Sequence, residues 1–142
     1  MPGAGGAVVL HGRILPLPGD TVGRDNRAMS RYPVNLHRAW HAHVYFGPET
    51  LDQARDLVAE AGQLFKVQVG RVHERKVGPH PQWSCQLAFS SEVFDALIPW
   101  LDAHRNGLDV FVHGLTGNDL ADHTEHAYWL GTAWPLKLEM FR

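Results

Sequence analysis

The sequence predicts an α+β domain in which an antiparallel sheet of four strands carries two helices on one face. The first reason is the pattern of hydrophobic residues between positions 38 and 113, which switches between the two-residue period of strands and the longer period of helices. The second is that glycines and prolines fall at the junctions of most of these segments. The third is composition: of 142 residues, 44% are hydrophobic and 20% are charged, as in ordinary globular domains.

The first strand and the first helix follow each other directly. Residues 38–46 alternate as a strand does, with Ala42, Val44 and Phe46 on one face and His41, His43 and Tyr45 on the other. Gly47 and Pro48 end this strand and open a helix, because proline suits a first helical turn. The apolar positions of the helix are Leu51, Ala54, Leu57, Val58 and Ala61. Gly62 is expected just past the end of this helix.

The next segments give two more strands, a second helix and a fourth strand. Residues 64–72 and 84–89 predict strands, separated by an irregular proline-rich loop at 78–81. Ser90 and Ser91 offer capping hydroxyls to the second helix. Its apolar face consists of Phe94, Leu97, Ile98 and Leu101, and Pro99 predicts a kink or a break within it. Residues 109–113 predict the last strand.

The complete order, strand–helix–strand–strand–helix–strand, is the split βαβ or ferredoxin-like arrangement. In this arrangement both helices cover one face of the sheet, and the opposite face is open to a ligand, a partner subunit or the C-terminal segment. Residues 136–140 alternate between apolar and charged side chains and predict a possible edge strand.

The first 37 residues differ from the rest in composition and in hydrophobic pattern. They hold six glycines and four prolines and show no sustained hydrophobic period. We therefore expect a flexible N-terminal tail at residues 1–37 and a single domain at residues 38–142. The start of the chain lacks the basic residues and the apolar length of a secretory signal, so we expect a cytoplasmic protein.

Charge and cysteine content exclude several classes of function. Thirteen Lys and Arg against 15 Asp and Glu give a formal net charge of −2, which offers no electrostatic reason to expect nucleic acid or an anionic membrane as a partner. No apolar run approaches the roughly 20 residues that a membrane span needs. Cys85 is the single cysteine, so a disulfide within the chain and a cysteine-rich zinc site are excluded. Cys85 falls on the inward face of its strand and is expected to be buried.

The chain contains ten histidines, and several map to one face of the predicted sheet. If the helices cover the apolar face, His41, His43 and His113 share the opposite one. The first and last strands lie close together in this topology, so His41 or His43 can approach His113 and share a metal ion with it. His80, His123 and His126 lie in segments that could fold over the same face. The nearest carboxylates are Asp119, Asp122 and Glu125, and the sequence leaves open which of them, if any, would coordinate a metal.

Several short motifs of the chain resemble those of the DOPA 4,5-dioxygenase family. They are His41-Ala42-His43-Val44-Tyr45-Phe46, Gly78-Pro79-His80-Pro81, Gln86-Leu87-Ala88-Phe89, Phe111-Val112-His113, Thr116-Gly117, Asp122-His123, His126-Ala127 and Trp129-Leu130-Gly131. The resemblance extends over about Arg38 to Gly131 and implies a small domain of ferredoxin-like fold.

The resemblance also implies a reaction. It is the extradiol cleavage of a catechol such as L-DOPA, opened between ring carbons 4 and 5 to a semialdehyde, with O₂ and a histidine-ligated non-haem Fe(II). On this basis we expect His43, His80 and His113 as metal ligands and His123 as the acid/base residue, with His41 and His126 able to exchange roles with these. The catechol and O₂ would be the partners, and a homodimer is possible.

Two other classes of function use the same features differently. One is a non-catalytic ferredoxin-like module that binds a ligand or dimerises through its open face, although the histidines expected there argue against an apolar interface. The other is a zinc hydrolase or isomerase that uses the same histidines, because imidazole ligands suit several transition metals. The metal content of the protein discriminates between these alternatives.

Overall fold

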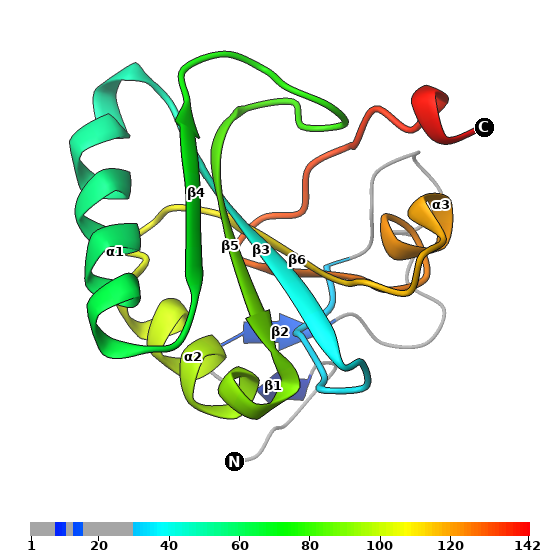
Figure 1. Ribbon diagram of the computed structural model, residues 1–142, viewed down its shortest axis with the longest axis horizontal. Helices are drawn as coiled ribbons and strands as arrows, with labels where there is room; N and C mark the ends of the chain where they lie inside the picture. The colour runs from blue at the N-terminus through cyan, green and yellow to red at the C-terminus, as the bar shows by residue number, and fades with distance from the viewer. Residues whose placement is uncertain (1–7, 11–12, 16–29) are drawn as a thin grey trace.

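A five-stranded antiparallel sheet forms the centre of the molecule, with two helices on one side of it (Figure 1). The computed structural model describes residues 8–10, 13–15 and 30–142. The strands of the sheet are β3 (Ala39–Phe46), β4 (Gln68–His73), β5 (Trp83–Ser90), β6 (Val110–Gly114) and β7 (Ala127–Leu130). The helices are α1 (Leu51–Leu64), α2 (Ser91–His104) and the short α3 (Asp119–Asp122), with 3₁₀ turns η2 (Pro48–Thr50) and η3 (Glu139–Phe141).

The strand order is β4-β5-β3-β6-β7, and every neighbouring pair is antiparallel. The four strands expected from the sequence are β3, β4, β5 and β6, and the first and last of them lie side by side. This confirms the ferredoxin-like α+β prediction. The fifth strand, β7, extends the sheet beyond β6.

The main core lies between the sheet and the two long helices. The predicted inward face of the first strand is confirmed, because Ala42, Val44 and Phe46 belong to one buried cluster with the side chains of α1 and α2. Cys85 is fully buried in the same cluster, as expected. The helices contribute Ala54, Leu57, Val58, Ala61, Phe94, Leu97, Ile98 and Leu101. Each large apolar side chain buried here contributes roughly 1.5–3 kcal/mol.

Two helix predictions differ from the structure near glycine and proline. The first helix does not end at Gly62 but continues to Leu64. A β-carbon at Gly62 would lie 3.0 Å from Cγ2 of Val69, so the glycine serves the close approach of α1 to β4. The second helix is unbroken at Pro99. Pro99 removes the hydrogen bond to the carbonyl of Asp95, and both residues lie on the exposed side of the helix.

The prediction of an edge strand at residues 136–140 is wrong, and the added strand is β7 instead. All four β7 residues are buried, so the segment lacks the alternation by which a half-exposed strand is recognised. Tyr128 and Leu130 join the helix-side core, whereas Ala127 and Trp129 face the other way. Residues 136–138 form no strand, and residues 139–141 form a 3₁₀ turn.

Most of the expected tail lies outside the described residues. Within them, β1 (Val8–Leu10) pairs with β2 (Arg13–Leu15) in an antiparallel hairpin. The guanidinium of Arg31 donates to the carbonyls of Glu125 at 2.6 Å and Ala127 at 2.8 Å, and the amide of Trp129 donates to the carbonyl of Arg31 at 2.8 Å. The boundary at Arg38 stays a prediction, and these contacts favour an earlier one. Among the described residues, no helix has the length and apolarity that would let it cross a membrane.

Candidate metal centre

The sheet face opposite α1 and α2 is covered by α3 and the C-terminal segment (Figure 1). A second, smaller cluster of buried side chains lies there, formed by Tyr45, Phe111, Ala127 and Trp129. The backbone amide of Lys137 donates to the carbonyl of Pro79 at 2.9 Å, which ties the C-terminal segment to the loop between β4 and β5. The sheet face that the sequence predicts to be open is therefore partly covered by these segments.

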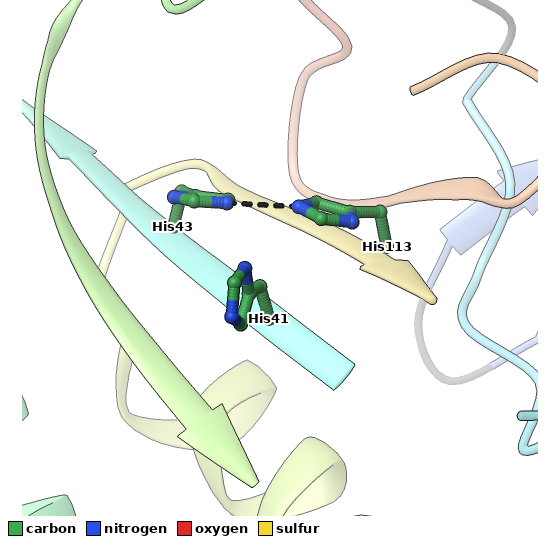
Figure 2. Close-up of side chains that lie close together, drawn as sticks. All are labelled: His41, His43 and His113. Carbon is green, nitrogen blue, oxygen red and sulfur yellow. Dashed lines mark hydrogen bonds between the residues drawn. The ribbon is translucent and has the colours of Figure 1, made fainter. Parts of the chain in front are cut away.

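Three histidines converge on this face. In the register of the sheet, His41 of β3 lies directly opposite His113 of β6, and His43 follows two residues later on the same side of β3. One ring nitrogen from each of the three lies within 4.8 Å of the others. Figure 2 shows the three rings gathered above the two strands. The predicted placement of His41, His43 and His113 on one face is confirmed.

Hydrogen bonding fixes which nitrogen of His113 is available to a metal. Nδ1 of His113 lies 2.9 Å from the carbonyl oxygen of Gly114, and since a carbonyl only accepts, Nδ1–H is the donor. In a neutral imidazole Nε2 then carries a lone pair. This atom lies 3.0 Å from Nε2 of His43, which donates to it (Figure 2). The hydrogen bond of His113 to Gly114 also orients its ring, as outer hydrogen bonds do for metal-ligating histidines.

The separation of these two nitrogens fits a shared ion. Two imidazole nitrogens that each lie about 2.1 Å from one ion, at a right angle to each other, are about 3 Å apart. A metal ion would therefore replace the hydrogen bond between His43 and His113 once both lone pairs turn toward it and the proton of His43 moves from Nε2 to Nδ1. His41 supplies a third nitrogen, and in the described residues the group contains no carboxylate.

Burial keeps these imidazoles in the form that binds metals. Desolvation lowers the pKa of His43 well below its usual 6.5, and the neighbouring histidines lower it further. Desolvation also lowers the pKa of His113 to about 3, against the opposing effect of its bond to Gly114. The pKa of His41 is lowered mainly by burial as well. At neutral pH all three are therefore uncharged, as imidazoles that bind a metal must be.

Two further histidines stand beside this group. The ring of His80 lies 4.2 Å from that of His43, and Nδ1 of His80 is hydrogen-bonded to the hydroxyl of Tyr45 at 2.8 Å. Burial lowers the pKa of His80 to about 4. The ring of His123 lies 4.4 Å from that of His113, and its Nδ1–H donates to the carbonyl of Asp119 at 2.7 Å. Both predicted site histidines therefore contact the group without belonging to the three converging nitrogens.

His126 and the three candidate carboxylates are placed differently. The ring of His126 lies 4.4 Å from that of His37. Asp122 is buried, and its oxygens accept from the amide of Thr116 at 3.0 Å and from its hydroxyl at 2.6 Å. Asp119 and Glu125 are exposed. Asp122 thus connects α3 to the turn after β6. This structural role could not be predicted from its position in the sequence.

Two aromatic contacts of the site were missed by sequence reasoning. The ring of Phe141 stacks on that of His123 with 4.5 Å between ring centroids. The hydroxyl of Tyr45 is hydrogen-bonded to Nδ1 of His80. Strand alternation did place Tyr45 on the correct face. Its partner lies in an irregular loop, however, and no periodic signal reports where such a loop folds.

Fold and site together define a class of protein: a ferredoxin-like domain with a candidate histidine metal centre on the sheet face away from its long helices. The chain matches the Dopa 4,5-dioxygenase family over residues 40–140 and belongs to that family.

Individual relatives agree with this assignment. A DOPA 4,5-dioxygenase of Amanita muscaria is 32% identical over 110 residues, which cover 71% of this chain and 48% of that protein. An uncharacterized 21.2 kDa protein of Botryotinia fuckeliana is 31% identical over 119 residues, covering 75% of this chain and 65% of that protein. The chain thus spans less than two thirds of each. The crystal structure of a candidate dioxygenase from Nostoc punctiforme superposes with a TM-score of 0.72 at 40% identity, covering 75% of this chain and 92% of that one.

Proposed function

We propose that this protein is a non-haem iron dioxygenase that opens the ring of a catechol such as L-DOPA by extradiol cleavage. The observation that carries the proposal is the convergence of three neutral histidine nitrogens within 4.8 Å, on the sheet face of a Dopa 4,5-dioxygenase family member. Imidazole ligands suit iron among several transition metals, and two histidines with a third ligand and open positions are the arrangement of non-haem Fe(II) oxygenases.

His41, His43 and His113 are the residues that would hold the iron. The sequence predicted His80 in place of His41, and the converging nitrogens favour His41. When bound, Fe(II) supplies a centre at which the catechol oxygens and O₂ come together and through which electrons pass. The reaction places both atoms of O₂ in the product, which is a ring-opened semialdehyde carrying a new carboxylate.

His123 would accept a proton from the catechol. Because its Nδ1–H donates to the carbonyl of Asp119, Nε2 of a neutral His123 carries the lone pair. Ring contacts with His113 and with Phe141 limit rotation of the His123 ring. An imidazole that takes up the hydroxyl proton and later returns it acts as a general base and then as a general acid.

The experiment combines metal analysis with turnover. After anaerobic purification the protein should contain iron, and with Fe(II), L-DOPA and air it should form a yellow product that absorbs visible light. Stoichiometric zinc with no catechol cleavage would favour a hydrolase or isomerase, and a metal-free protein would favour a binding module. Iron bound in the absence of cleavage of any catechol would refute the dioxygenase proposal.

A further inference from the structure

Tyr45 and His80 form a buried pair at the edge of the histidine group. The hydroxyl of Tyr45 lies 2.8 Å from Nδ1 of His80, and the two residues are 3% and 6% exposed. Tyr45 comes from β3, two residues after His43, whereas His80 comes from the proline-rich loop before β5. The bond therefore fixes a loop residue to the central strand that carries two of the candidate ligands.

The direction of this hydrogen bond follows from burial. Nδ1 of His80 is the partner described for the Tyr45 hydroxyl among residues 30–142. If Nδ1–H donated to Tyr45, the hydroxyl hydrogen of Tyr45 would be buried without an acceptor, which is costly. When Tyr45 donates instead, its hydrogen is used and Nδ1 of His80 accepts it. A neutral imidazole carries one proton, which then resides on Nε2.

This direction changes what His80 can do. With Nδ1 occupied by the Tyr45 hydroxyl and Nε2 protonated, His80 has no lone pair to offer to a metal. It has a donor N–H instead, on a ring that lies 4.2 Å from His43 and 6.1 Å from Phe111. Because the ring lies beside His43, this donor would be close to the oxygen atoms of a molecule bound at the metal centre.

We propose that Tyr45 holds His80 in the Nε2–H tautomer, so that His80 donates a hydrogen bond to a catechol oxygen and does not ligate the metal. The role toward the catechol rests on the proposed function, whereas the tautomer and the absence of ligation do not. Tyr45 is then a positioning residue, and His80 is a substrate-binding residue.

Long-range ¹H–¹⁵N correlation spectra of the metal-free full chain, labelled with ¹⁵N-histidine, test the tautomer directly. The His80 signals are assigned by their loss in His80→Gln. We expect the Nε2–H pattern in the wild type and a shift toward a mixture of tautomers in Tyr45→Phe. Tyr128→Phe, a change at a buried tyrosine in the helix-side core, should leave the His80 pattern unchanged. An Nδ1–H pattern in the wild type, or no change in Tyr45→Phe, overturns the proposal.

Two measurements test the consequences of this tautomer. His80→Gln should bind one equivalent of Fe(II) under anaerobic conditions, as we expect of the wild type. His113→Gln should bind none. Loss of iron in His80→Gln would make His80 a ligand and overturn the proposal. An Fe(II)-loaded His80→Ala variant should bind 4-nitrocatechol at least about tenfold more weakly, because alanine, unlike glutamine, has no N–H to donate to a charged oxygen. Unchanged affinity overturns the substrate role. Failure of the wild type to bind 4-nitrocatechol overturns that role together with the proposed function, while the spectra decide the tautomer separately.

Discussion

His113 illustrates how much of the candidate site depends on single atoms. Its Nδ1 is committed to the carbonyl of Gly114, and its Nε2 faces His43. Strand alternation was sufficient to predict that His41, His43 and His113 share a face, because side chains on a strand alternate strictly. It could not predict which ring nitrogen faces inward. That depends on the rotation of each ring and on hydrogen bonds that form only in the folded chain.

Ligand loss and proton-transfer loss can be separated at the level of single residues. His43→Ala and His113→Ala should lose both iron and turnover, because each removes a proposed ligand. His123→Ala should retain iron and turn over about 10²–10⁴-fold more slowly, the usual contribution of a positioned acid/base group. Metal content and kcat are measured on the same preparations. His104→Gln, at an exposed residue in the last turn of α2, serves as the control. An iron-free His123→Ala would identify His123 as a ligand.

The buried histidines also predict how acid affects stability. Their pKa values are lower in the folded protein than the usual 6.5, so below pH 6.5 the unfolded chain binds more protons than the folded one. The free energy of unfolding of the metal-free protein should therefore fall as the pH drops from 7 toward 4, by up to about 1.4 kcal/mol per pH unit for each such histidine. Urea unfolding in EDTA at several pH values measures this. His113→Gln should show a shallower slope, and an equal slope would mean that His113 does not contribute.

At the scale of elements, the sequence predicted which segments form strands and helices more securely than where the domain begins and ends. In β3, α1, β5 and α2 the apolar side chains of the helix-side core recur at regular spacing, so these segments carry a period. β7 has no exposed side and residues 30–37 have no regular structure, so neither leaves such a signal. Both depend on tertiary contacts, among them the hydrogen bonds of Arg31 to the residues around β7.

Truncation tests where the domain begins. A chain that starts at Ser30 should melt close to the full-length protein, because it retains the bonds of Arg31 and that of Asn35 to the carbonyl of Ser91. A chain that starts at Arg38 loses them, each worth about 0.5–1.5 kcal/mol net, and should melt several degrees lower. Thermal melts by circular dichroism compare the two. Equal melting temperatures would support the boundary predicted at Arg38.

At the scale of the whole molecule, the metal should stabilise the fold because its proposed ligands come from two strands that are distant in sequence. A ligand that binds only the folded state at 100 times its Kd adds about 2.7 kcal/mol to the free energy of unfolding. Anaerobic Fe(II) should therefore raise the melting temperature by several degrees, and EDTA should reverse the rise. His113→Ala should show no such shift; a shift in that variant equal to the wild type would place the binding site elsewhere.

The position of β3 between β5 and β6 gives the site two layers of different stability. Because β3 is hydrogen-bonded on both edges, its amides belong to the part of the chain that opens only when the whole sheet does. His123 and Phe141 stand on the end of a one-turn helix and on a 3₁₀ turn, and we expect such short elements to open at a smaller free-energy cost. If the central strands hold an ion as proposed, local opening of these covering segments would let a small substrate enter and leave without release of the metal.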